Sequence, residues 1–109
     1  MVSTSEHAII VLHASFPIDS ERRDEALDHV ETLVEQSNQE DGVIEYRAAV
    51  DIEDENTIRI FEQYEDAEAV DVHNQTEHFQ AFEERLPELL AGEPTVIRFE
   101  VSDATTLEL

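Results

Sequence analysis

Apolar residues follow one another almost without interruption from His7 to Phe16, where Ile, Val and Leu dominate and Pro17 closes the run. A short apolar run of this composition predicts a strand buried on both faces. From Ser20 to Asn38 the apolar positions instead recur at helical spacing, with carboxylates on the other side. This pattern predicts an amphipathic helix with Asp19 or Ser20 as its N-cap.

Two β-rich runs, Val43 to Asp51 and Thr57 to Glu65, flank a polar stretch and predict a hairpin. A turn centred on Asp54 would bring three cross-strand pairs onto one face of the sheet. The expected pairs are Tyr46 with Glu62, Ile44 with Tyr64, and Ala48 with Ile60.

The segment after Asp66, an expected N-cap, predicts a short helix, a break near Thr76 and a second helix. His73 shares the face of the first helix with Ala67 and Val70. The second helix presents Phe79, Phe82, Leu86 and Leu89 together, Pro87 offsets its last turn, and Gly92 closes it. Residues 95–101 alternate as a final strand.

The order is therefore βαββα(α)β within a single domain spanning residues 1–109, an α+β fold. It predicts a four-stranded antiparallel sheet with its helices on one face. The first strand is apolar on both sides, so helices alone cannot cover it. We expect the open face to pack against a second copy in a homodimer.

Charge excludes several partner classes, because 28 acidic residues against 6 basic ones give a formal charge of −22. Such a surface repels nucleic acid and anionic membranes. All six basic residues are Arg and Lys is absent, a balance that suits a halophilic protein kept soluble in concentrated salt. The chain also lacks Cys, a signal segment and any run long enough to span a bilayer, so we expect a cytoplasmic protein.

Three stretches together resemble the antibiotic biosynthesis monooxygenase family. They are residues 42–47 (GVIEYR), residues 61–69 (FEQYEDAEA), and His73 followed by residues 78–82 (HFQAF). The resemblance covers about Ile9 to Val101 and implies the family's ferredoxin-like dimeric α+β barrel. Its better-known members oxidise quinols or polycyclic phenols with O₂ and use neither flavin nor metal. Close relatives degrade haem, which the absence of Trp here argues against.

Cofactor-free oxygenation needs groups that relay a phenolic proton, and His and Tyr suit that task. We therefore expect His73 and His13 as catalytic residues, although His73 could merely bond within the helix break and His13 could be a satisfied strand residue. The residues expected to line a substrate cavity are Tyr46, Glu62, Tyr64, Phe79 and Phe82. Glu62 could equally be a structural partner of an Arg, and His78 a helix-start residue. We expect His7 and His29 to be surface groups.

We expect neither metal nor cofactor. His73 and His78 are five apart, a poor spacing for one site on one helix, and two glycines cannot build a phosphate loop. Two functions remain open: a monooxygenase acting on a quinol or polycyclic phenol, and a non-catalytic dimer that binds a small aromatic molecule in a stress or regulatory role.

Overall fold

The computed structural model describes residues 8–109, so the expectation that His7 is a surface group lies outside it. The elements follow the order read from the sequence: β1 (Ile9–Pro17), η1 (Ser20–Arg22), α2 (Arg23–Ser37), β2 (Val43–Val50), β3 (Thr57–Tyr64), α3 (Ala67–Asn74), α4 (Glu77–Leu89) and β4 (Thr95–Val101). The predicted α+β, ferredoxin-like arrangement is therefore confirmed.

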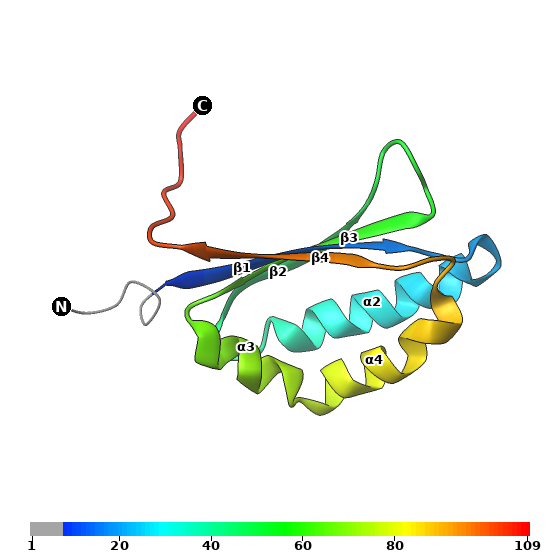
Figure 1. The fold of residues 1–109 in the computed structure, drawn as a ribbon, viewed down its shortest axis with the longest axis horizontal. Coiled ribbons are helices and arrows are strands. Elements are labelled where there is room, and N and C mark those ends of the chain that lie inside the picture. The colour runs from blue at the N-terminus through cyan, green and yellow to red at the C-terminus, as the bar shows by residue number, and fades with distance from the viewer. Residues whose placement is uncertain (1–7) are drawn as a thin grey trace.

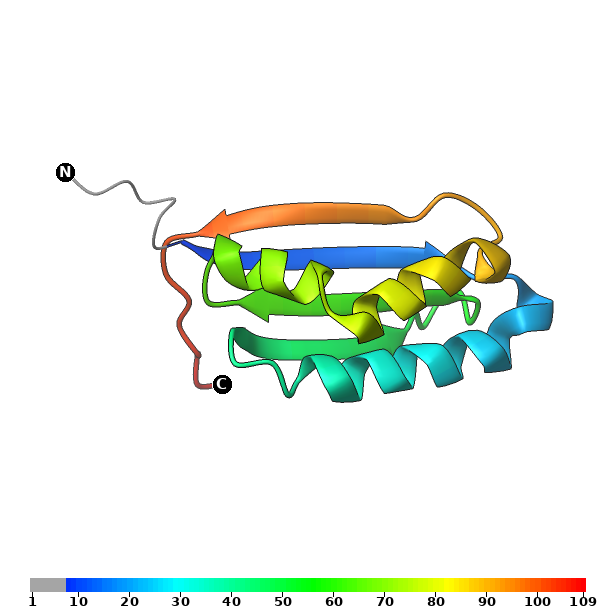
Figure 2. The same ribbon diagram turned by 90° about the horizontal axis from the view of Figure 1, so that it is seen from below.

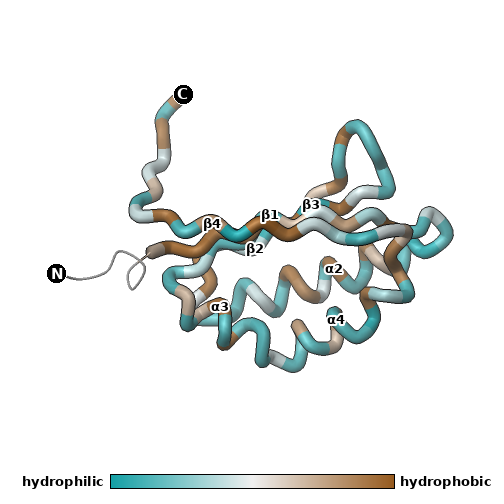
Figure 3. Tube along the Cα trace, viewed as in Figure 1, coloured by the Kyte–Doolittle hydropathy of each residue, from teal (hydrophilic) through white to brown (hydrophobic). Residues whose placement is uncertain are grey.

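The four strands form one antiparallel sheet in the order β2-β3-β1-β4. Helices α2, α3 and α4 all lie on the same side of this sheet (Figures 1 and 2). Brown, apolar segments run along β1 in the middle of the sheet, whereas teal, polar segments recur along the helices (Figure 3). Within the described residues, no helix is long and apolar enough to cross a membrane.

Side-chain caps fix where the helices begin. Asp66 accepts a hydrogen bond from the backbone N–H of Ala69 at 2.8 Å and starts α3 as predicted. Thr76 accepts one from Phe79 at 3.2 Å and starts α4, so the break falls where the sequence placed it. Asp19 caps only the short turn η1; α2 begins directly after it at Arg23 and has no side-chain cap of its own.

The core fills the space between the helices and one face of the sheet. Its members come from all the layers: Ala14, Phe16, Ile18, Ala26, Val30, Leu33, Tyr46, Ile58, Ile60, Phe82 and Leu89 are all buried. A smaller cluster of Ile10, Tyr64, Ala69 and Val70 packs under α3. On the outer surface, Arg85 of α4 pairs with Glu25 of α2 and ties these two helices together.

Within residues 8–109, no helix lies over the other face of the sheet. Phe61, Ile97 and Phe99 are 38%, 47% and 46% exposed, although each is a large apolar residue. The odd-numbered residues of β1 lie on the same face because side chains alternate along a strand. This exposed apolar face is the one that the sequence analysis expects to pack against a second copy of the chain.

Two local expectations need correction. Tyr46 pairs with Glu62 and Ala48 with Ile60 as predicted, but Tyr64 lies opposite Val43 and not Ile44. An irregularity between Val43 and Glu45 adds a residue to β2, so Ile44 turns outward and is 52% exposed. Pro87 does not offset the last turn, since α4 continues through it to Leu89.

Candidate active site

A cavity of about 280 Å³ lies between the sheet and α4. Four of the predicted substrate-binding residues line it: Tyr46, Glu62, Phe79 and Phe82. Its remaining walls are largely apolar and include Leu12, Ala14, Phe16, Ile60, Leu86 and Val96. An apolar cavity with a few polar groups is the usual form of a small-molecule site.

Glu62 is the buried carboxyl of this cavity, with only 7% of its surface exposed. Its Oε1 accepts a hydrogen bond of 2.6 Å from the hydroxyl of Tyr64, two residues along β3 on the same face. In the part of the chain that the structure describes, no Arg forms an ion pair with Glu62, so the alternative of a structural Arg–Glu pair does not apply. Burial raises the pKa of Glu62 from 4.5 to about 7, although the Tyr64 hydrogen bond lowers it. The side chain can therefore take up and release a proton near neutral pH.

The two tyrosines stay protonated. Burial raises the pKa of Tyr46 and of Tyr64 well above 10, and the nearby charge of Glu62 adds to both shifts. Tyr64 is fully buried and does not reach the cavity wall, contrary to the expectation that it lines the cavity. Tyr64 instead supports Glu62 from behind as a hydrogen-bond donor.

His73 lies behind the cavity and not in its wall. Its ring is 1% exposed and packs against the rings of Tyr46, Tyr64 and Phe79, with centroids 5.3, 5.6 and 4.9 Å away. Burial lowers the pKa of His73, although a hydrogen bond to Glu40 raises it. Nδ1 of His73 lies 2.8 Å from Oε2 of Glu40, and Nε2 is buried without a hydrogen-bond partner among residues 8–109.

Glu40 and His78 complete a cluster that the sequence did not predict. Nε2 of His78 lies 2.6 Å from the same Oε2 of Glu40 that contacts His73. A five-residue spacing is poor for facing one site from one helix, but here His73 belongs to α3 and His78 to α4, so the spacing argument does not apply to them. Only the match of His78 to the family pattern signalled a role, and nothing in the periodicity of the chain marks Glu40.

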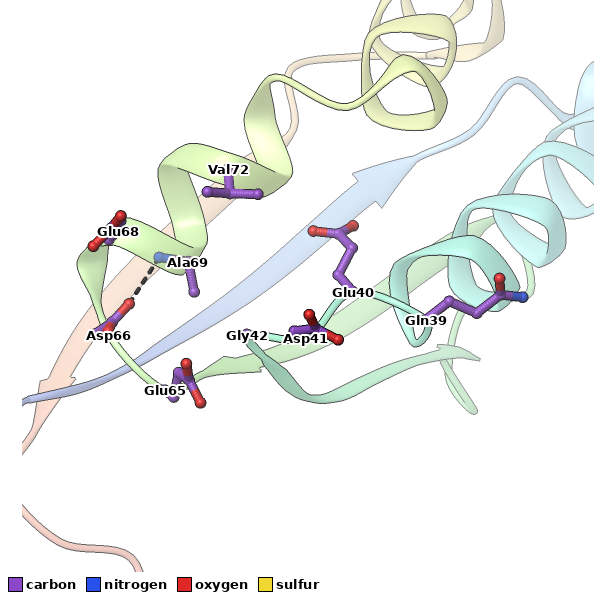
Figure 4. A pocket seen from close by; sticks show the side chains of 9 residues that line it. All are labelled: Gln39, Glu40, Asp41, Gly42, Glu65, Asp66, Glu68, Ala69 and Val72. Carbon is purple, nitrogen blue, oxygen red and sulfur yellow. Dashed lines mark hydrogen bonds between the residues drawn. The ribbon is translucent and has the colours of Figure 1, made fainter.

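An amide clamp holds Glu40 in place. The Asn38 side chain donates to the carbonyls of Val34 and Tyr46, both at 2.9 Å, and accepts from the Tyr46 backbone N–H at 3.1 Å. Asn38 thereby joins the end of α2 to β2 and fixes the short turn between them. Figure 4 shows the Glu40 side chain extending from this turn toward α3.

A surface depression of about 480 Å³ adjoins Glu40 and carries four further carboxylates, those of Asp41, Glu65, Asp66 and Glu68 (Figure 4). Of these, Asp66 is already engaged as the cap of α3. The depression is open to solvent and therefore provides an acidic surface and not an enclosed site.

His13 does not belong to the cavity. Its neighbours Leu12 and Ala14 point into the cavity, so His13 lies on the opposite, uncovered face, where it is opposite Phe61 and Ile97. The expectation that His13 joins His73 in one pocket is wrong for this reason. His29, expected at the surface, is partly exposed and lies 3.7 Å from Glu25.

Comparison with known proteins agrees with this arrangement. The family described as "Antibiotic biosynthesis monooxygenase" matches residues 9–85. A Bacillus subtilis protein named "Putative monooxygenase YcnE" is 36% identical over 95 residues, which cover 87% of this chain and all of that protein.

Solved structures share the fold. A crystal structure of an antibiotic biosynthesis monooxygenase, 28% identical, superposes with a TM-score of 0.79 over 89% of this chain and 99% of that one. Rv0793 from Mycobacterium tuberculosis, 19% identical, superposes with a TM-score of 0.84 over 90% of this chain and 99% of that one. The family match spans well over half of the chain, and the chain belongs to the antibiotic biosynthesis monooxygenase family.

Proposed function

We propose that this protein is a cofactor-independent monooxygenase that oxidises a quinol with O₂. The observation that carries the proposal is a buried, proton-accepting carboxyl, Glu62, in the wall of a largely apolar cavity, whose other carboxylate residue, Glu83, is exposed. The names of its relatives support the reaction class, since YcnE is named a monooxygenase.

The reaction needs no external reductant because the quinol supplies all the electrons. A quinol and O₂ give a hydroxyquinone and water: one oxygen atom enters a ring C–H bond and the other leaves as water. The substrate loses four electrons, two from the quinol and two from the C–H bond, and O₂ gains four. The protein must only remove the phenolic proton, since a phenolate gives up an electron to O₂ more readily than a phenol.

Glu62 is the group placed to take that proton. It lines the cavity, whereas His73 does not line it and packs instead against the rings of Tyr46, Tyr64 and Phe79. We therefore assign Glu62 as the general base and His73 as a positioning residue behind Tyr64. The sequence analysis expected His73 to be catalytic and Glu62 to bind substrate. We now propose Glu62 as the proton acceptor in place of His73.

Cavity size favours a small substrate. A volume of about 280 Å³ lies just below the roughly 300–1,000 Å³ found for small-molecule sites. A quinol of one or two rings fits such a space better than a polycyclic phenol. Phe79 and Phe82 offer aromatic surfaces against which a flat ring can pack.

The test is oxygen uptake with one- and two-ring quinols, measured above the rate of autoxidation without protein. Glu62→Gln keeps the shape of the side chain and an acceptor for Tyr64, but it cannot take a proton. We expect a loss of about 10²–10⁴-fold in kcat. Glu100→Gln removes an exposed carboxylate of β4 and serves as the matched control, with unchanged turnover.

A non-catalytic dimer that binds a small aromatic molecule is the alternative. It would be supported if the quinols quench or shift a binding signal at the cavity while oxygen uptake stays at the autoxidation rate. We further propose that the protein acts as a homodimer in the cytoplasm. The uncovered apolar face and the absence of Cys support these two points.

A further inference from the structure

We infer that Glu40, His73 and His78 form a binding site for a single Zn²⁺ ion or a similar transition-metal ion. This site is separate from the quinol cavity and does not depend on the monooxygenase activity. It lies where the turn after α2 meets the junction between α3 and α4.

The donor geometry is already assembled. One carboxylate oxygen and two imidazole nitrogens, each able to serve as a ligand atom, lie within 4.8 Å of one another. Tetrahedral zinc sites place such atoms about 2.0–2.2 Å from the metal and hence roughly 3.4 Å apart. For an ion to enter, the contacts to Glu40, at 2.8 and 2.6 Å, would open by less than about 1 Å, and the two imidazole nitrogens, within 4.8 Å of each other, would close toward the same spacing.

A second observation points to a missing partner. Oε1 of Glu40 is buried and has no hydrogen-bond partner within the described residues. A buried carboxylate oxygen without a partner is costly, because it has lost its water. A water molecule in the fourth position of an ion held by Oε2 could donate a hydrogen bond to Oε1, whereas a proton shared between Oε2 and the histidines would leave Oε1 without a partner.

No side-chain cation of the described chain competes for this carboxylate. The chain has no Lys, and among residues 8–109 no Arg forms an ion pair with Glu40. The formal charge of −22 further favours the approach of a divalent cation.

The ligand set selects the metal. Imidazole suits zinc, copper, cobalt and nickel, whereas Mg²⁺ and Ca²⁺ prefer oxygen ligands. Three protein ligands leave a fourth position for water, and His78 and Glu40 also border a solvent-open depression of about 380 Å³ through which an ion can enter. Gln36, Gln39 and Glu77 line the same depression. Zinc bound here would join α3, α4 and the turn at residues 38–42.

The experiment is titration of the EDTA-treated, dialysed protein with ZnCl₂ by calorimetry, in the presence of excess MgCl₂. Magnesium occupies the diffuse acidic surface and leaves the imidazole site free. We expect one Zn²⁺ per chain and, for Co²⁺ in its place, the intense visible absorption of tetrahedral cobalt. His78→Ala and Glu40→Gln should each weaken zinc binding more than about 100-fold, since loss of a residue that merely orients a ligand already costs about 10–100-fold.

His29→Ala is the matched control, because His29 is also partly exposed on a helix but lies outside the cluster. It should bind zinc like the wild type. The inference is overturned if zinc binding disappears in excess magnesium, or if His78→Ala and Glu40→Gln bind as tightly as the wild type. Far-ultraviolet circular dichroism of the two variants shows whether they fold. If either is unfolded, the cobalt spectrum of the wild type decides: octahedral, weakly absorbing cobalt refutes the site.

Discussion

Replacing Glu62 with Gln should make the protein markedly more stable above neutral pH. The buried carboxyl has a pKa of about 7 in the folded protein against 4.5 normally. Between these two values the unfolded chain gives up the proton while the folded chain still holds it. Stability from this group is therefore full below pH 4.5, falls as pH rises to about 7, and stays low above it.

The magnitude follows from the shift. One pKa unit corresponds to 1.36 kcal/mol, and integrating the two titration curves gives a difference of about 2.5 kcal/mol between pH 5 and pH 8. This is an upper figure, because water entering the cavity would reduce the cost of the charge. Relative to Glu62→Gln, the wild type should lose about 2.5 kcal/mol of unfolding free energy over that range.

Urea unfolding at pH 5, 6, 7 and 8, at one fixed salt concentration, measures this difference directly. All other carboxyls are common to both proteins, so their contributions cancel. Glu100→Gln should give a curve parallel to the wild type, because that residue is exposed. If the wild-type and Glu62→Gln curves also run parallel, Glu62 is ionised and solvated in the folded state, and its role as a base near pH 7 fails with it.

Three further measurements test the fold and its surroundings. Sedimentation equilibrium should give a dimer, and Phe99→Asp on the uncovered sheet face should give a monomer; a monomeric wild type would refute the sheet-to-sheet dimer. The melting temperature should rise by at least about 5 °C from low to molar KCl, because salt screens the repulsion among 28 carboxylates, and a flat profile would contradict the halophilic interpretation. Gly42→Ala should cost about 1–3 kcal/mol in urea unfolding, because its Cβ would lie 2.5 Å from Cβ of Ala69; Ala69→Gly in the same chain should restore most of that loss, and no recovery would show another cause.

The fold could be predicted because its signals are local. Runs of β-rich residues, helical spacing, the cap at Asp66 and the break near Thr76 each act over a few positions, and together they predicted the element order. The hairpin register also followed from the turn, as the Tyr46–Glu62 pair shows. The predicted pair of Ile44 with Tyr64 is wrong, because the sequence pattern gives no sign of the extra residue in β2 between Val43 and Glu45.

The site was predicted only where it depends on strand and helix faces. Tyr46 and Glu62 share a sheet face, and Phe79 and Phe82 share a helix face, so their convergence on one cavity follows from periodicity. Helical periodicity also predicted that His73 faces the sheet. It did not predict that the His73 ring is fully buried behind the cavity and not in its wall. Whether a side chain reaches a cavity or stops behind another ring depends on packing in three dimensions, which periodicity does not describe.

His73 and His78 can reach the same carboxylate, Glu40, because a break separates the two helices that carry them. Five residues within one helix would place two histidines on different faces, but Thr76 ends that continuity and starts α4 in a new direction. The histidines then approach from two helices, and Asn38 positions the turn that carries Glu40 between them. Tyr64 packs against His73 on one side and donates to Glu62 on the other. The carboxyl at the cavity and the carboxyl at the histidine cluster are thus separated by two buried rings, which lets the two sites hold different chemistry, a proton in one and a cation in the other.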